Sequence, residues 1–273
     1  MPTVPSTDGT TTSRDGTTIA YTKAGTGPAL VLVDGALCWR ESGVTPTLLP
    51  ELSQHFTVYA YDRRGRGEST DTTPYAMERE IEDLDAVMAV AGGSPFVCGI
   101  SSGAVLSMYA VQQGSTPAKL ALFEAPLVVV DETDRKHPAD MLPQLQKLVA
   151  EDRRADAVRY FMVDIIGVPN AFMLFMKVFW RKAYRANLAA AHTLPYDISF
   201  LSRTGSRVPA DAAASITMPC AAITGSKSPA ALHKAVDATA AAIPGAQVIV
   251  VPEQSHMIKP KPFTQALVGF FGS

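Results

Sequence analysis

Residues 99–103 read Gly-Ile-Ser-Ser-Gly and fit G-x-S-x-G, a pattern that places a nucleophilic serine on a sharp turn between a strand and a helix. An apolar run at 95–100 leads into the motif and a helix-compatible run follows it, as that geometry requires. Glycines at −2 and +2 select Ser101 as the nucleophile. Ser102 then offers a backbone N–H to an oxyanion, and its side chain is expected to have no role. Glycine and serine also occur in ordinary turns, so the motif alone is a weak signal.

A serine becomes a strong nucleophile when a base removes its proton, and histidine suits this task at neutral pH. Five histidines occur in the chain. His256 is favoured because it stands in the loop after the apolar run 246–251, just before the last helical stretch. The other four stand before a strand, in a long helical segment or inside a helix: His55, His137, His192 and His233.

The third group of such a site is a carboxylate that orients the histidine and stabilises its charged form. The loop that begins at Gly225 follows a predicted strand, but Ser228 stands there and no carboxylate occurs before Asp237. Glu124 ends the neighbouring apolar run 119–124. A buried glutamate is costly unless it is paired, which favours Glu124 as the acid. If its strand ends earlier, Glu124 is a surface residue.

Short apolar runs of five to seven residues must position these side chains. Such runs are typical of strands buried on both faces of a parallel sheet, and helical stretches separate most of them. Asp15-Gly16 predicts an antiparallel hairpin near the start of the chain. The alternation predicts an α/β fold with a mostly parallel, doubly wound sheet. The runs are 29–34, 56–62, 95–100, 119–124, 220–224 and 246–251.

One connection is far longer than a crossover needs. Roughly ninety residues separate the runs 119–124 and 220–224, and their pattern is helical. We expect a helical cap at 128–211, inserted into a core made of 1–127 and 212–273. A Met- and Phe-rich face of this segment either lines a pocket for an apolar substrate or packs the cap onto the core. Its members are Phe161, Met162, Phe172, Met173, Phe175, Met176, Phe179 and Trp180.

Together with the serine motif and the late histidine, two further segments carry a family resemblance. VLVDGALCW (31–39) and YAYDRRGRGES (59–69) occur in the order found in α/β-hydrolases, which this chain resembles over its whole length. The resemblance implies the α/β-hydrolase fold. Asp34-Gly35 replaces the usual His-Gly, but a backbone N–H of Gly35 or Ala36 can still complete an oxyanion hole. The charged residues Asp62, Arg63 and Arg64 are expected to satisfy loop backbone groups.

GISSGA, FEAPL, VDGAL and TGSKSPA together are similar to the zearalenone-hydrolase group of lactonases. That group has its acid as a glutamate after the same strand. The resemblance implies an active enzyme with the triad Ser101, Glu124 and His256, and with Gly35 and Ser102 as oxyanion donors. It also implies a cap tryptophan against the substrate, for which Trp180 is the candidate.

These residues predict a serine hydrolase that cleaves a small apolar carboxylic ester or lactone, with a zearalenone-type macrolactone as one candidate. The alternatives are hydrolysis of a thioester, amide or C–C bond on the same triad, or ligand binding with negligible turnover. No metal or organic cofactor is needed for this chemistry.

A net charge of −2 gives no basic field for nucleic acid or an anionic membrane. No apolar stretch is long enough to span a bilayer, and the polar N-terminus does not resemble a signal peptide. Three separated cysteines (Cys38, Cys98 and Cys220) favour a reducing compartment, so a cytoplasmic location is expected. Whether the protein is a monomer or a homodimer stays open.

Overall fold

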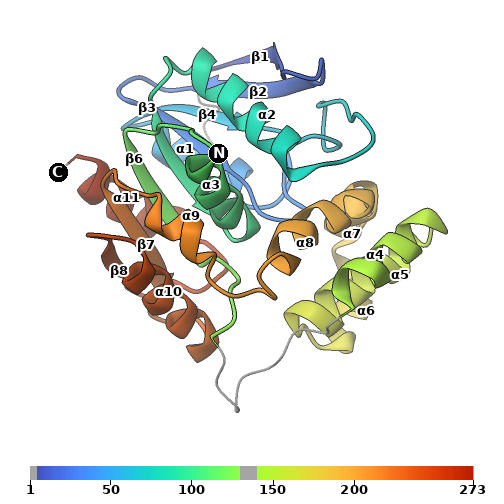
Figure 1. Ribbon diagram of the computed structural model, residues 1–273. Coiled ribbons are helices and arrows are strands. Elements are labelled where there is room, and N and C mark those ends of the chain that lie inside the picture. Colours follow the sequence, from blue (N-terminus) through green and yellow to red (C-terminus); the bar gives the residue numbers. More distant parts are fainter. Residues whose placement is uncertain (1–4, 130–139, 273) are drawn as a thin grey trace.

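A single eight-stranded sheet forms the centre of the computed structural model, which describes residues 5–129 and 140–272 (Figure 1). The strand order is β1-β2-β4-β3-β5-β6-β7-β8, in which β1 and β2 are antiparallel to their neighbours and the remaining strands are parallel. The predicted mostly parallel sheet and the N-terminal hairpin are therefore confirmed. The strands are β1 (Ser6–Thr12), β2 (Thr18–Ala24), β3 (Ala29–Val33), β4 (Thr57–Tyr61), β5 (Phe96–Ile100), β6 (Lys119–Phe123), β7 (Cys220–Gly225) and β8 (Gln247–Val251).

Helices cover both faces of the sheet, and each face has its own apolar core. On one face, Leu30 and Leu32 of β3 pack in a cluster with side chains of α1 (Thr45–Leu52) and α11 (Pro260–Phe271). On the other, Val31 and Val33 pack in a cluster with side chains of α2 (Met77–Val90), α3 (Ser102–Gln112) and α10 (Ala230–Ala242). Because successive side chains of a strand point to opposite faces, a strand between two helical layers is apolar throughout. This explains the continuous apolar runs.

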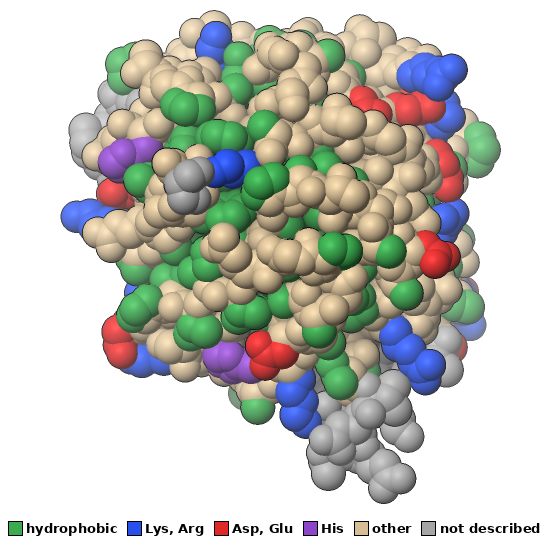
Figure 2. All heavy atoms as spheres, turned by 60° about the vertical axis from the view of Figure 1, so that its left-hand side comes forward, with side chains coloured by type: hydrophobic (Ala, Val, Ile, Leu, Met, Phe, Trp, Pro, Cys, Tyr) green, Lys and Arg blue, Asp and Glu red, His purple; other side chains and the backbone are tan. Residues whose placement is uncertain are grey.

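β8 departs from that pattern. It lies at the edge of the sheet, and the side chains of Val248 and Val250 are 46% and 50% exposed. Figure 2, which brings the left-hand side of Figure 1 forward, shows hydrophobic side chains at the surface there. The expectation that this run is buried on both faces was wrong, because an apolar run does not reveal whether a further layer covers the strand.

Helices follow β6 before the chain returns to the sheet at β7. We refer to α4 through α8 as the insertion helices; they gather beside the sheet domain in Figure 1. α8 packs against α4 of the insertion and against α2 and α3 of the core. The elements are α4 (Met141–Ala150), α5 (Arg154–Arg159), the π-helix η1 (Tyr160–Ile166), α6 (Asn170–Phe179), α7 (Arg181–Ala190), the 3-10 helix η2 (Ala191–Thr193), α8 (Leu194–Ser202) and, before β7, α9 (Ala210–Ala214).

The expected cap boundary at 128 falls just before residues 130–139, which lie outside the described residues. No helix among the residues described has both the length and the apolar character that crossing a membrane requires.

Candidate active site

Ser101 stands on a strained turn between β5 and α3. Its backbone has φ 54° and ψ −122°, a conformation that costs a non-glycine residue about 1–3 kcal/mol. Both flanking glycines are required by close backbone contacts. A Cβ on Gly99 would lie 2.6 Å from the Cα of Ala104, and one on Gly103 would lie 2.1 Å from the carbonyl oxygen of Val33. The glycines therefore let the turn sit tightly between α3 and the end of β3.

Glu124 and His256 are in direct contact. Nδ1 of His256 lies 2.7 Å from Oε2 of Glu124, which is fully buried just after β6. Burial raises the pKa of Glu124, but hydrogen bonds from His256, Ser228 and the Gly225 N–H outweigh it and hold the pKa below its ordinary value. An ionised carboxylate only accepts, so Nδ1 carries the proton and Nε2 is left as the acceptor.

The loop after β7 lacks a carboxylate but binds the one that β6 provides. Oε1 of Glu124 accepts hydrogen bonds from the Thr224 hydroxyl at 2.9 Å, the Gly225 N–H at 2.9 Å and the Ser228 hydroxyl. From the sequence, Ser228 was noted only because it stands where a carboxylate is usually found. In the structure its hydroxyl donates a hydrogen bond to Glu124, which the loop sequence alone did not reveal.

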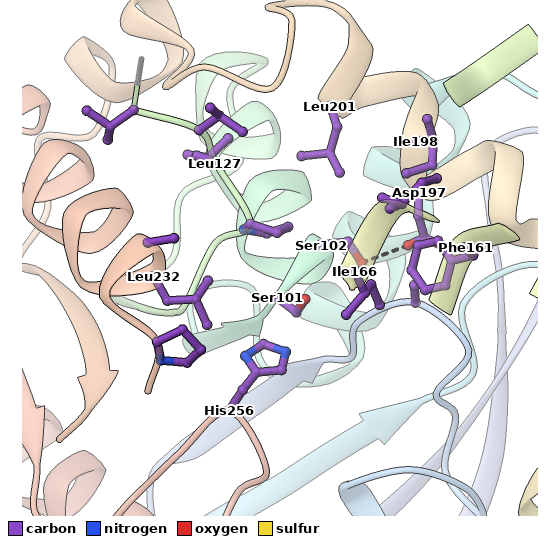
Figure 3. A pocket seen from close by; sticks show the side chains of 17 residues that line it. Ser101, Ser102, Leu127, Phe161, Ile166, Asp197, Ile198, Leu201, Leu232 and His256 are labelled. Atoms are coloured by element: carbon purple, nitrogen blue, oxygen red, sulfur yellow. Dashed lines mark hydrogen bonds between the residues drawn. The ribbon is translucent and has the colours of Figure 1, made fainter. Parts of the chain in front are cut away.

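Ser101 and His256 line one cavity of about 310 Å³, and Figure 3 shows both side chains at it. Within the described chain no hydrogen bond joins the Ser101 hydroxyl to the His256 ring. The ring of Phe123 stacks on the imidazole at 6.0 Å between centroids. Apart from Asp197, the rest of the lining is mainly apolar: Ala36, Ser102, Pro126, Leu127, Val128, Val129, Phe161, Ile165, Ile166, Ile198, Leu201, Pro229, Ala231 and Leu232.

Backbone N–H groups approach Ser101 from two sides. Ser102 is the first residue of α3, where N–H groups have no partner within the helix. On the other side the loop after β3 passes close to Ser101, because a Cβ on Gly35 would lie 3.1 Å from the Cβ of Ser101. Ala36 lines the cavity, whereas Gly35 is not among its lining residues. Of the two candidates for the second donor, Ala36 has the access to the cavity.

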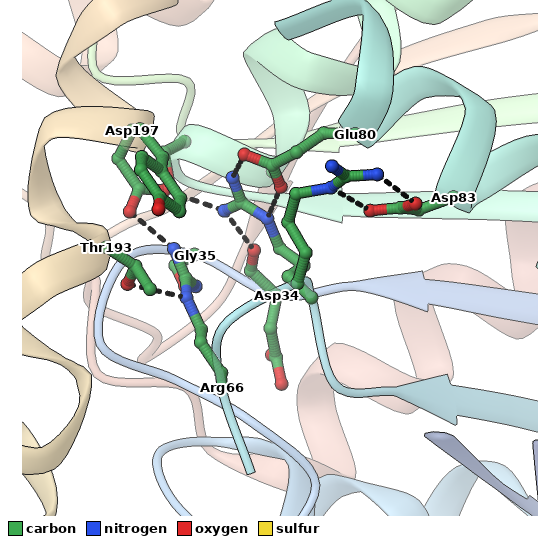
Figure 4. Close-up of polar contacts among 12 residues, drawn as sticks. Asp34, Gly35, Arg66, Glu80, Asp83, Thr193 and Asp197 are labelled. Carbon is green, nitrogen blue, oxygen red and sulfur yellow. Dashed lines mark hydrogen bonds and ion pairs between the residues drawn. The ribbon is translucent and has the colours of Figure 1, made fainter. Parts of the chain in front are cut away.

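Arginines support this loop from behind (Figure 4). Arg63 donates to the carbonyl oxygen of Asp34 at 3.2 Å, in line with the expected loop-satisfying role. Arg66 donates to the carbonyl oxygen of Gly35 at 2.7 Å and was not singled out by sequence. Arg64 pairs with Asp83 and donates to the carbonyl oxygen of Arg79 at 3.0 Å, so the backbone group that it satisfies belongs to α2.

Asp34 is a buried carboxyl beside these arginines. Thr45 donates to its Oδ2 at 2.6 Å, while Oδ1 has no hydrogen-bond partner among the described residues. Burial raises the pKa of Asp34 to about 6, although Thr45, Arg66 and Arg63 oppose it. The positive charges of Arg63 and Arg66 are already balanced by the carboxylates of Glu80 and Asp197. An ionised Asp34 would therefore add an uncompensated buried charge.

Asp34→Asn is expected to stabilise the protein above pH 6. Between pH 4 and 6 the folded wild type holds a proton that the unfolded chain has lost, so its free energy of unfolding falls as pH rises. Asparagine removes this loss and still accepts from Thr45. Relative to wild type, the variant should therefore gain roughly 2–3 kcal/mol between pH 4 and pH 7. Urea unfolding at both pH values measures it, and an equal difference at the two would contradict the assignment.

Trp180 does not line the cavity of Ser101. It is half-exposed and lines a separate groove with Trp39 and Phe179. Of the Met- and Phe-rich face predicted from the sequence, Phe161 alone is among the cavity residues. It lies in a π-helix, whose wider turn brings Phe161, Ile165 and Ile166 to one side, and a pattern of 3.6-residue periodicity does not predict this.

Most of the chain matches one protein family. The sequence profile of the alpha/beta hydrolase family matches residues 25–263. The chain belongs to this family. A solved alpha/beta hydrolase from Sphaerobacter thermophilus DSM 20745 is 42% identical to this hydrolase, with a TM-score of 0.88 over 96% of this chain and 100% of that chain.

Two other relatives are more distant. A pimeloyl-[acyl-carrier protein] methyl ester esterase of Stenotrophomonas maltophilia (strain K279a) is 26% identical over 85% of this chain and 87% of its own. The enol-lactonase of Burkholderia xenovorans LB400 has a TM-score of 0.66 at 21% identity, covering 97% of this chain and all of that one, which shows a shared fold. In this hydrolase no three His, Cys, Asp or Glu side chains within residues 5–129 and 140–272 gather as metal ligands would.

Proposed function

We propose that this hydrolase cleaves carboxylic esters, lactones included, through an acyl-enzyme formed on Ser101. His256 is the general base and Glu124 the acid of the triad. The backbone N–H groups of Ser102 and of Ala36 or Gly35 stabilise the oxyanion.

The main support is the 2.7 Å contact between Glu124 and His256 at the cavity that also holds Ser101. A fully buried carboxylate with a lowered pKa at this point has the properties that the acid of a triad needs. The 26% identical methyl ester esterase supports an ester as the bond that is cleaved.

Because the His256 ring has its proton on Nδ1, Nε2 is free to accept a proton. Nε2 takes the proton of Ser101 as Oγ forms a bond to the carbonyl carbon, while Nδ1 stays hydrogen-bonded to Glu124. The carbon–oxygen bond of the ester then breaks, and the leaving alkoxide takes that proton from Nε2. Water repeats the cycle on the acyl-enzyme and releases the acid. For a lactone, both products remain one molecule, a hydroxy acid.

The cavity favours a small or medium-sized apolar substrate. Its volume of about 310 Å³ is at the low end of ligand pockets, and aliphatic side chains of the insertion helices form one wall. We propose that these helices act as a cap that selects the apolar part of the substrate. A zearalenone-type macrolactone remains a specific candidate within this class.

A substrate panel tests the proposal. Matched p-nitrophenyl esters, lactones, thioesters and amides are assayed, together with labelling of Ser101 by a fluorophosphonate probe. We expect labelling and turnover of esters or lactones. Labelling of Ser101 together with a preference for thioesters or amides would show that the enzyme cleaves one of those bonds rather than an ester. Absence of both labelling and turnover would favour a ligand-binding protein.

Phe161→Ala should lower kcat/KM for a long-chain ester about ten-fold more than for the acetate, because the variant loses apolar contact along the substrate chain. Trp180→Ala should leave this ratio unchanged, because its side chain lies outside the cavity. Steady-state kinetics with p-nitrophenyl acetate and octanoate measure both. The opposite pattern, with Trp180 decisive, would restore the assignment made from sequence.

The three cysteines are free thiols, which supports the proposed cytoplasmic location. Burial raises the pKa of Cys38 to about 12 and of Cys220 to about 12, so neither forms a reactive thiolate at neutral pH.

A further inference from the structure

A buried carboxylate on an insertion helix binds a loop at the carboxyl ends of the parallel strands. Asp197 of α8 is 1% exposed and binds two arginines of the loop after β4. Its Oδ1 lies 2.6 Å from Arg63 and its Oδ2 lies 2.5 Å from Arg66. Arg63 also makes two hydrogen bonds to Glu80, at 2.7 and 2.9 Å. We call these four side chains the Asp197 cluster.

One arm of the cluster fixes the loop after β3. Arg66 is held by Asp197 on one nitrogen and donates from another to the carbonyl oxygen of Gly35 at 2.7 Å. In a trans peptide the C=O and the N–H point in opposite directions. With the Gly35 oxygen turned toward Arg66, the N–H of Ala36 points the other way, and Ala36 lines the cavity beside Ser101.

The other arm reaches the residue after the nucleophile. The Ser102 hydroxyl donates to Oδ1 of Asp197 at 2.8 Å, as Figure 3 shows. Ser102 opens α3, and its backbone N–H is the first proposed oxyanion donor. A side chain that was expected to be idle thus ties this donor to the same carboxylate that positions Ala36.

Electrostatics strengthen the Ala36 donor. Burial raises the pKa of Asp197, but Arg63 and Arg66 outweigh it and lower the pKa, so the side chain is charged. Two arginines and two carboxylates leave the cluster without net charge. A guanidinium on the carbonyl of a peptide also polarises that peptide and makes its N–H a stronger donor in a buried site.

We propose that Asp197 is a positioning residue for oxyanion stabilisation, which it performs through Arg66 on one side of the site and Ser102 on the other. The inference rests on the proposed function. It makes a cap residue part of the machinery that stabilises the transition state, in addition to any role in substrate selection. Within the described residues, the hydrogen bonds of Asp197 go to Arg63, Arg66 and Ser102, and none goes to Ser101 or His256.

The chain offers a matched control. Asp83 is also 1% exposed and makes two hydrogen bonds of 2.7 Å to Arg64 from the same loop. In the part of the chain that the structure describes, no hydrogen bond or ion pair joins Asp83 to the loop after β3 or to Ser102. If these carboxylates only stabilise the fold, Asp83→Asn and Asp197→Asn should affect activity in the same way.

The experiment measures kcat and KM for p-nitrophenyl acetate in Asp197→Asn and Asp83→Asn, with the melting temperature of each. We expect kcat of Asp197→Asn to fall about 100-fold with KM within about three-fold, the size of effect seen when one oxyanion donor is lost. Asp83→Asn should keep kcat within about three-fold despite a comparable loss of thermal stability. Equal kcat in the two variants would overturn the proposal.

A ligand pair separates positioning from general damage. A trifluoromethyl ketone forms an oxyanion on a nucleophilic serine, whereas the matching methyl ketone binds with little such charge. Asp197→Asn should weaken the first about 100-fold and the second less than three-fold. Equal weakening of both would overturn the proposal.

Ser102→Ala decides the matter if Asp197→Asn does not fold. It keeps the backbone N–H and removes one arm, so we expect kcat to fall about ten-fold with KM unchanged. Wild-type kcat in this variant would overturn the proposal. Ser101→Ala is measured in parallel. If it retains activity, the proposed function fails, whereas an inactive Ser101→Ala beside a fully active Ser102→Ala rejects the positioning role alone.

Discussion

Replacement of Ser101 by alanine is expected to lower kcat for ester hydrolysis by about 10⁶-fold, because the other hydroxyl at the cavity, that of Ser102, is hydrogen-bonded to Asp197 and not to a general base. The fold should be retained. Alanine has a smaller side chain, and the tight turn at φ 54° depends on the absence of a side chain at Gly99 and Gly103, which the variant keeps. Turnover of p-nitrophenyl acetate measures the loss, and circular dichroism checks the fold.

Near-normal turnover by this variant would refute an acyl-enzyme at Ser101. Mass spectrometry after fluorophosphonate treatment provides the control, since wild type should gain one adduct and Ser101→Ala none. An adduct that persists in the variant would identify a different nucleophile.

Glu124→Gln is expected to lower kcat by about 10⁴-fold, as removal of a triad carboxylate does elsewhere. The amide is neutral and cannot stabilise a protonated His256. Its NH₂ would also donate to Nδ1, which forces the ring into the tautomer whose Nε2 carries the proton and cannot accept from Ser101. kcat across pH 6–9 is the measurement. Wild-type kcat in a folded Glu124→Gln would place the acid elsewhere.

Moving the carboxylate from position 124 to position 228 provides a second test of the acid. Because the Ser228 hydroxyl contacts Oε1 of Glu124, an aspartate at 228 starts from a loop that already faces this site. We expect Glu124→Ala with Ser228→Asp to recover part of the activity that Glu124→Ala loses. Ser228→Asp alone should be damaging, since it would bring two carboxylates together in a buried place.

Local patterns predicted the parts of the site that depend on local backbone geometry. Ser101 was chosen from glycine spacing, and the structure explains both glycines, because an added Cβ would lie only 2.6 or 2.1 Å from neighbouring atoms. Glu124 was found because a carboxylate at the end of a buried strand needs a partner, and the structure brings it to His256. Parallel strands put their carboxyl ends at one edge, so strand order was enough to bring these residues together.

Residues that act through tertiary contacts were missed. Asp197 lies in the mainly apolar helix α8, 134 residues beyond its partner Arg63, and the run 194–202 does not show which cation such a carboxylate would meet. Trp180 was chosen because the family resemblance implies a tryptophan on the cap, but which face of a helix meets a cavity depends on how the helices pack. The π-helix at Tyr160–Ile166 further changes which of its side chains point toward the cavity.

The Asp197 cluster has a consequence for recombining hydrolases of this family. An insertion between two strands resembles a module that could be exchanged to transfer substrate preference from one enzyme to another. Here the exchanged piece would carry Asp197 away and leave Arg63 and Arg66 as buried cations with one carboxylate fewer. A working chimera would need to keep α8 with the core helices α2 and α3 against which it packs, and to exchange α4 through α7 instead.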